Sequence, residues 1–80
     1  MKEKIKKHFH PSFKNELEKQ LDFLGEKEVS WILSDLNELN DENFLITKMK
    51  YESHNNTIDL HFQNVETKKN ISRTLILTRT

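Results

Sequence analysis

Residues 45–62 read LITKMKYESHNNTIDLHF, and hydropathy alternates along them on both sides of Asn55–Asn56. The less polar side chains fall at every second position, namely Leu45, Thr47, Met49 and Tyr51 before the pair and Ile58, Leu60 and Phe62 after it. A period of two is typical of strands with one buried face. Because Asn tolerates positive φ, Asn55–Asn56 is expected to form a two-residue hairpin turn. The stretch therefore predicts two antiparallel strands.

The turn also determines which residues of the strands are expected to pair. A two-residue turn places Tyr51 opposite Leu60. A third alternating run, residues 71–78, follows a polar loop around Thr67–Lys68, and its matching register sets Leu60 against Leu75. All three apolar faces then agree, which predicts a three-stranded antiparallel meander with one buried face.

Two amphipathic helices are predicted before the strands. Their apolar residues recur at helical spacing and are Phe13, Leu17, Leu21 and Leu24 in the first helix and Val29, Ile32, Leu33, Leu36 and Leu39 in the second. Pro11 and Ser12 are expected at the start of the first helix, and Gly25 is expected to end it in a left-handed conformation. The second helix is expected from about Glu26 to Asn40. The predicted fold class is α+β: a small two-layer ααβββ domain, with a helical hairpin packed on a three-stranded antiparallel meander.

The chain is expected to form one domain, because 80 residues can bury only one small core. Residues 11–80 hold both helices and all strands, and residues 1–10 are expected to form a basic, flexible arm. No secretory signal is expected, since no apolar stretch follows the lysines of the arm, and no stretch approaches the ~20 apolar residues of a membrane span. These features predict a cytoplasmic protein without membrane contact.

Composition excludes several classes of enzyme. The chain has no Cys and one Gly, which excludes cysteine nucleophiles, Cys-based zinc sites and glycine-rich phosphate loops. His8 and His10 could share a metal, but two ligands are too few. No catalytic, cofactor-binding or metal-binding residue is assigned, and a non-enzymatic role without cofactors is expected. One question stays open: the predicted register opposes Glu52 and Asp59 beside His61, which indicates either a frayed hairpin end or a bound cation.

The formal net charge of zero is a cancellation between segments. Residues 1–14 sum to +4, residues 15–47 to −7 and residues 48–80 to +3. A chain with such an uneven distribution can meet a charged partner, although its total charge gives no overall attraction.

The second helix carries the predicted partner surface. At 3.6 residues per turn, Trp31 falls roughly 160° from the apolar stripe of that helix, and Trp is enriched in interface hot spots. The predicted surface consists of Trp31, Glu28, Asp35 and Glu38. It favours a small interaction or regulatory protein that binds another macromolecule, expected to be a protein. Two alternatives remain: Ile5 and Phe9 of the arm could cover Trp31, and the edge strand 71–78 could form a homodimer.

Nucleic-acid binding is the alternative function. The positive groups that could meet phosphates are Lys2, Lys4, Lys6 and Lys7 of the arm and Lys48 and Lys50 of the outer sheet face. The other residues expected on that face are His61, Gln63, Ser72, Thr74 and Ile76.

Residues 25–62 resemble the recognition helix and wing of winged-helix transcription regulators. The resemblance rests on Val29–Leu36, of the form VSxxLxxL, on the strand FLITKMK at residues 44–50, and on the hairpin that follows. It covers about half the chain and implies that the second helix enters the DNA major groove. Phosphate repulsion would oppose that insertion, because this helix carries Lys27 against Glu26, Glu28, Asp35 and Glu38.

Overall fold

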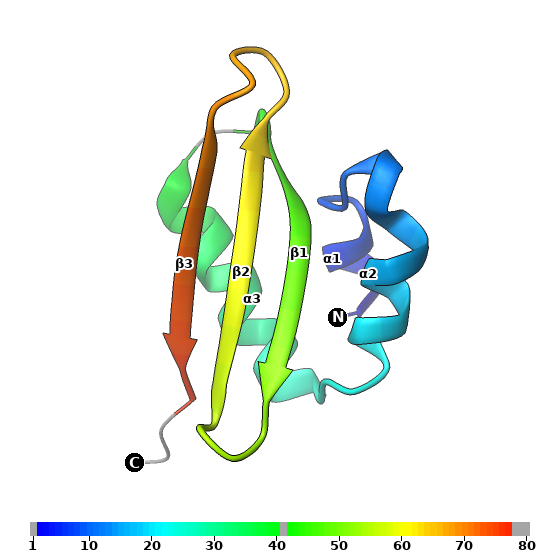
Figure 1. The fold of residues 1–80 in the computed structure, drawn as a ribbon, viewed down its shortest axis with the longest axis vertical. Coiled ribbons are helices and arrows are strands. Elements are labelled where there is room, and N and C mark those ends of the chain that lie inside the picture. The colour runs from blue at the N-terminus through cyan, green and yellow to red at the C-terminus, as the bar shows by residue number, and fades with distance from the viewer. Residues whose placement is uncertain (1, 41, 78–80) are drawn as a thin grey trace.

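The computed structural model describes residues 2–40 and 42–77. Its elements are helix α1 (Lys2–Lys6), the 3-10 turn η1 (Pro11–Phe13), helices α2 (Lys14–Leu21) and α3 (Glu26–Leu39), and strands β1 (Phe44–Glu52), β2 (Thr57–Asn64) and β3 (Asn70–Ile76). The strands form one antiparallel sheet in the order β1-β2-β3, which confirms the predicted α+β meander. Residue 78, where the third strand was predicted to end, lies outside the described residues. In Figure 1, α3 crosses one face of the sheet, while α1 and α2 lie beside β1.

The hydrophobic core lies between the sheet and the helices. Its largest fully buried side chains are Phe62, Ile5, Leu17, Ile32, Ile46, Ile58, Leu60 and Val29. Every second residue of β2 from Ile58 onward is buried, so the predicted inner face of the sheet is confirmed. Burial of an aliphatic or Phe side chain contributes about 1.5–3 kcal/mol. This layer therefore fixes the position of α3 against the sheet.

The strand register differs from the predicted one by two residues. The connection between β1 and β2 is the four-residue segment 53–56, whose last residue has a φ of 54°, and not a two-residue turn. Tyr51 therefore lies opposite Ile58 instead of Leu60, and Leu60 lies opposite Arg73 instead of Leu75. A slip of two residues keeps the side chains of residues 48–52 and of β2 and β3 on their predicted faces, because the side-chain period of a strand is two. Before Thr47 the register shifts by one more residue, so Leu45 lies opposite Gln63 on the outer face and Ile46 is buried in its place. The prediction that Leu45 belongs to the inner face is therefore wrong.

The helix ends also differ from the predicted ones. Ser12 lies in the 3-10 turn, where its N–H donates to Nδ1 of His10 (3.2 Å), and the N-cap of α2 is Phe13. Gly25 is not a left-handed C-cap: its φ of −88° and ψ of 173° are extended, and it is the N-cap of α3. The helix that does end in a left-handed residue is α3, whose C-cap is Asn40. No helix in the described part of the chain is long and apolar enough to cross a membrane.

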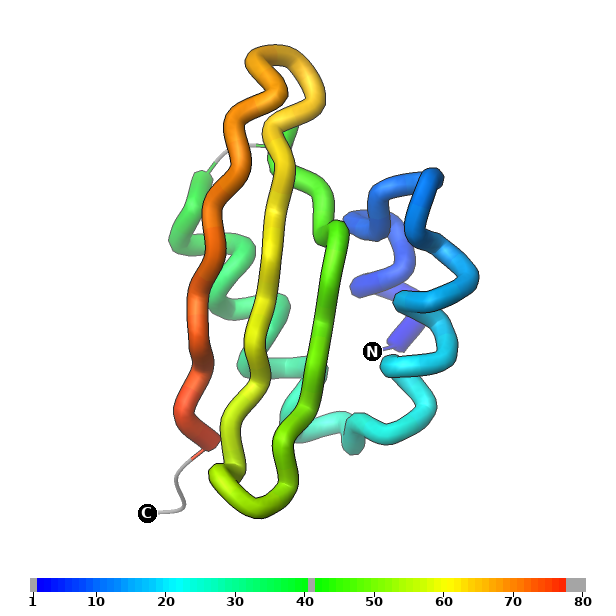
Figure 2. The backbone as a smooth tube through the Cα atoms, viewed as in Figure 1, coloured from blue at the N-terminus to red at the C-terminus, as the bar shows by residue number. Residues whose placement is uncertain are grey.

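The N-terminal segment packs into the domain, unlike the predicted flexible arm. Ile5 is fully buried, and Phe9 is 6% exposed. The N–H of His10 donates to the carbonyl of Ile46 (2.9 Å), and the N–H of Ile46 donates to the carbonyl of His8 (2.7 Å). Figure 2 shows the resulting course of the chain, with the N-terminal residues beside β1. Apolar burial and backbone pairing therefore place the N-terminal lysines on a fixed scaffold.

Candidate functional site

Arg73 and Asp35 form an ion pair between β3 and α3. Arg73 lies on the inner face of the sheet, in the same row as its half-buried apolar neighbours at 71 and 75. Its Nε lies 3.2 Å from Oδ2 of Asp35, which is 7% exposed. Its Nη2 lies 3.7 Å from Oε2 of Glu38, whose side chain is 70% exposed. Asp35 thus holds α3 against β3, which leaves little of its side chain for a partner.

Burial dominates the electrostatics of this ion pair. It raises the pKa of the Asp35 carboxyl above the ordinary 3.8, the Arg73 guanidinium lowers that pKa, and the Glu38 carboxylate raises it. Within the described chain, Oδ2 of Asp35 has the contact with Arg73 but no well-aligned hydrogen bond. A buried carboxyl with a raised pKa can mark a functional site. Here its place between two packed elements indicates a structural role.

Glu28 and Trp31 also have contacts within the domain. Oε1 of Glu28 accepts the backbone N–H of Gly25 at 2.8 Å, which caps the first turn of α3. Trp31 is half-buried and packs against the core, and Nζ of Lys27 lies 5.5 Å from its ring centroid. A cation–π contact at an exposed site is worth about 0.5–1 kcal/mol. Trp31 is thus neither a fully exposed anchor nor fully covered.

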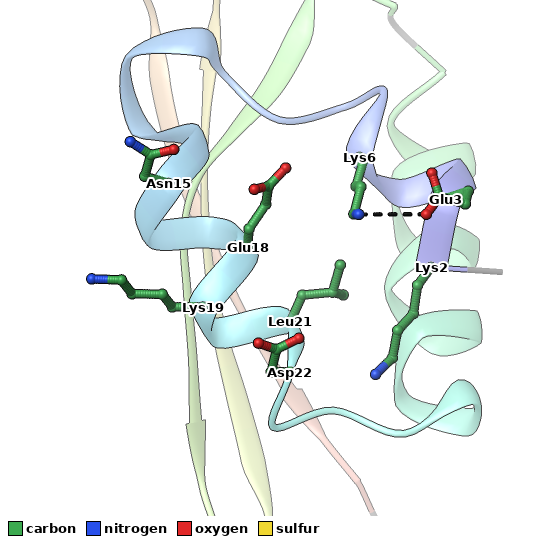
Figure 3. Close-up of a pocket in the computed structure, with 8 residues that line it drawn as sticks. All are labelled: Lys2, Glu3, Lys6, Asn15, Glu18, Lys19, Leu21 and Asp22. Carbon is green, nitrogen blue, oxygen red and sulfur yellow. Dashed lines mark hydrogen bonds and ion pairs between the residues drawn. The ribbon is translucent and has the colours of Figure 1, made fainter.

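The four N-terminal lysines are divided between two grooves. Lys2 and Lys6 line a groove between α1 and α2 that also holds the carboxylates of Glu3, Glu18 and Asp22 (Figure 3). Nζ of Lys6 lies 3.4 Å from Oε2 of Glu3. Positive charge in this groove is therefore offset by neighbouring carboxylates.

Lys4 and Lys7 line the second groove, which lies between α1 and α3. It has a volume of about 530 Å³ and is lined by Lys4, Lys7, His8, Ser30, Leu33, Ser34 and Asn37. None of these side chains is acidic, and every polar one can donate a hydrogen bond. This groove was not predicted from the sequence. The available signal was the polar i, i+4, i+7 spacing of Ser30, Ser34 and Asn37 on the second helix.

The outer face of the sheet carries the side chains that were predicted for it. Its cross-strand rows include Lys48–His61–Ser72, Lys50–Asp59–Thr74 and Glu52–Thr57–Ile76. Asp59 lies opposite Lys50 and not Glu52, and it accepts a hydrogen bond from Oγ1 of Thr74 (2.9 Å). Glu52 and Asp59 are therefore not opposite each other, and the reason for expecting a cation between them is removed. No group of three or more His, Asp or Glu in the described residues is arranged to hold a metal ion.

Within residues 2–40 and 42–77, β3 is a free edge of the sheet, since it pairs with β2 alone. The N–H of Leu77 donates to the carbonyl of Asn56 (2.8 Å), which fixes the phase of hydrogen bonding. Bonded and non-bonded positions alternate along antiparallel strands, so every second residue of β3 directs its backbone groups away from β2. These outward residues are Asn70, Ser72, Thr74 and Ile76.

The two edges of the sheet differ in how they are protected. At β1, residues 8–10 pair with Ile46, the extra residue Thr47 shifts the register, and two lysines follow. Natural sheets protect free edges with such covering segments, bulges, lysines and prolines. Residues 70–76 contain no Lys or Pro, and the charge of Arg73 is directed at Asp35. The β3 edge therefore lacks the protection that β1 has.

Comparisons of the chain with protein-family models, with curated proteins and with solved structures gave no match. No family is therefore assigned, and the winged-helix resemblance of residues 25–62 has no support from these comparisons. The candidate surfaces rest on this chain's own residues. They are the β3 edge with Glu38 beside it, the half-buried Trp31 on α3, and the groove between α1 and α3.

Proposed function

We propose that this chain is a small, non-enzymatic interaction protein that binds a protein partner through the open edge of β3. The observation that carries the proposal is the row of outward backbone groups at Ser72, Thr74 and Ile76 on an unprotected edge. A partner strand laid along β3 would satisfy them with main-chain hydrogen bonds. The absence of cysteine from the sequence is in keeping with a cytoplasmic site of action.

Side chains beside the edge would select the partner. Ile76 is 68% exposed on the outer face of the sheet. On the other face, α3 carries the half-buried Trp31 and, seven residues further on the same flank, the exposed Glu38. An apolar and an acidic group beside an open edge favour a strand with apolar and basic side chains. This proposal keeps Trp31 and Glu38 from the predicted surface and gives Glu28 and Asp35 roles inside the domain.

Nucleic-acid binding has less support from the geometry. Lys48 and Lys50 lie on the outer face of the sheet, whereas Lys4 and Lys7 line a groove against α3. The two remaining N-terminal lysines lie beside carboxylates. A phosphate backbone is bound by cations that follow one track, and these lysines are distributed over separate faces.

Ser72→Pro tests the proposed edge. It removes an outward N–H without removing a hydrogen bond to β2, and edge strands tolerate proline at such positions. The tagged chain is used to recover its partner from the host, and recovery with Ser72→Pro is expected to fall by about tenfold or more. The matched control is Ser72→Ala, which keeps the N–H and should recover as much partner as the wild type.

Thermal unfolding followed by circular dichroism checks that both variants are folded. Equal recovery by folded Ser72→Pro and Ser72→Ala would show that the edge is not the contact. If Ser72→Pro does not fold, Ile76→Lys takes its place, because it adds a protective lysine at an exposed position. Sedimentation velocity of the purified chain identifies a second copy as the partner if it finds a dimer that Ser72→Pro dissociates.

A further inference from the structure

We propose that the groove between α1 and α3 binds the phosphate group of a small phosphorylated molecule. The groove is formed by Lys4, Lys7 and His8 on one side and by Ser30, Ser34 and Asn37 on the other. This site is independent of the β3 edge, and its test does not depend on the identity of the protein partner.

The spacing of the residues on both helices directs donors into one groove. Ser30, Ser34 and Asn37 follow each other at i, i+4 and i+7, so they lie along one face of α3. Lys4 and Lys7 come from α1 and the turn after it, three positions apart. Burial of Ile5 in the core holds this segment in place. The groove is therefore presented by a docked element and not by a free tail.

Among residues 2–40 and 42–77, the cations of this groove have no carboxylate partner. No ion pair involves Lys4 or Lys7 among the described residues, and no acidic residue lines the groove. The other two lysines of the segment face Glu3, Glu18 and Asp22. Of the four lysines in this short segment, Lys2 and Lys6 thus lie near carboxylates, whereas Lys4 and Lys7 do not. A bound anion would balance the charge of Lys4 and Lys7.

The chemistry of the lining favours phosphate. Two ammonium groups, two hydroxyls, one amide and one imidazole can all donate hydrogen bonds, and a phosphate monoester offers three acceptor oxygens with a charge near −2. Charge-assisted hydrogen bonds of this kind are roughly twice as strong as neutral ones. Leu33 adds an apolar wall for the organic part of the molecule.

The extent of the groove favours a small molecule over a polymer. A neighbouring groove, of about 460 Å³, shares His8 and Asn37 with the groove between α1 and α3 and is also lined by Glu42, which carries a carboxylate. On the far side of α1, Lys6 is paired with Glu3, and Lys2 lines a groove that also holds the carboxylates of Glu18 and Asp22. Uncompensated positive charge is therefore confined to the two lysines of this one groove, whereas a nucleic acid needs a longer row of cations.

Amide chemical shifts followed during titration test this site on the full chain. The probes are inorganic phosphate and phenyl phosphate, with sodium chloride at matched ionic strength as the reference. Saturable shifts are expected at Lys4, Lys7, Ser30, Ser34 and Asn37 with both phosphates. Lys4→Gln/Lys7→Gln should weaken binding by about tenfold or more, because it removes both charge-assisted contacts. Ser34→Ala should weaken it severalfold.

Lys2→Gln/Lys6→Gln is the matched control, since it makes the same charge change on the same segment. Its affinity for phenyl phosphate should stay within about twofold of wild type, because its lysines lie in the other groove. Equal loss in both double variants would mean general attraction to positive charge and would overturn the proposal. So would the absence of saturable shifts with both phosphates. If a single-stranded oligonucleotide binds far more tightly than phenyl phosphate, the ligand of the groove is a nucleic acid and the proposal of a small molecule is wrong.

Discussion

At the scale of single residues, Arg73 explains most about how this chain is built. It occupies a position on the inner face of β3 where the alternation calls for an apolar side chain, and its charge meets the buried Asp35. A slip of β3 by two residues would move the guanidinium away and leave a buried carboxylate without compensation. We infer that this ion pair helps to select the observed register over the one predicted from the sequence.

The effect of removing Arg73 should depend on pH. Arg73→Gln removes the charge that lowers the pKa of Asp35, so at pH 7 it is expected to destabilise the fold by about 1–3 kcal/mol, less than for a fully buried pair because Arg73 is 37% exposed. The net pKa of Asp35 is raised in the folded state, so its protonation favours folding, and its ionisation opposes folding as pH rises through the folded pKa. Urea unfolding should therefore show a smaller cost of Arg73→Gln in acid than at pH 7.

Asp35→Asn/Arg73→Gln is the control for this reading. Neutralising both partners removes the buried charge, so the double variant should be more stable at pH 7 than Arg73→Gln alone. A cost of Arg73→Gln that is the same at both pH values and unaffected by Asp35→Asn would show that lost packing of the arginine side chain, and not charge, is responsible.

The sequence placed these residues on faces but did not identify their contacts. Their angle on a helical wheel placed Asp35 and Trp31 on the polar side of the second helix. In the structure, β3 and α1 both contact α3, so more of the helix surface is buried than its apolar stripe alone. The alternation of β3 contained an available signal. With Ser72 and Thr74 expected on the outer face, Arg73 falls on the inner face, and a cation in an apolar row requires a buried anion.

At the scale of elements, α1 is the largest difference from the sequence expectation. Its lysines made residues 1–10 resemble a solvated arm, because Ile5 and Phe9 are too few to give a helical period. The structure buries both and pairs His8 and His10 with β1. Such tertiary contacts cannot be read from a segment of this length, since they depend on the space that α2, α3 and β1 leave open.

Ile5→Ala measures how firmly α1 is docked. Because Ile5 is fully buried, the substitution should lower the free energy of unfolding by about 2–4 kcal/mol, from lost transfer free energy and a residual cavity. Urea denaturation provides the measurement, and Lys4→Ala on the same helix, at an exposed position, should change it by less than about 0.5 kcal/mol. Equal free energies of unfolding for the two variants would mean that α1 is not docked, and would favour the flexible arm predicted from the sequence.

The strands show which features of an element the sequence determines well. Their existence and order were predicted, and so were their faces except at the start of β1, where Ile46 is buried instead of Leu45. Period-two alternation is strong in residues 45–62, and a two-residue slip does not change faces. Their register was not, because it depends on a four-residue turn with one left-handed residue and on the extra residue at Thr47. Both are local features of the backbone, and an Asn-rich segment such as residues 53–56 is compatible with more than one turn conformation.

At the scale of the whole molecule, the zero net charge separates into surfaces with distinct chemistry. In the described part of the chain, one sheet edge pairs with the N-terminal segment at Ile46, and the other, next to Glu38, pairs with no further strand. A groove without carboxylates lies between α1 and α3. These features allow a protein partner and a small anion to bind at separate places, so binding of one need not displace the other.

Hydrogen exchange of the β3 amides, with and without the recovered partner, tests the proposed function most directly. In the free protein the N–H groups of Ser72, Thr74 and Ile76 should exchange fast, while those of Ile71, Arg73 and Leu75 should already be protected by β2. Addition of the partner should protect the first set. If the first set stays unprotected while the partner is bound, β3 is not the contact and the account of the open edge is wrong.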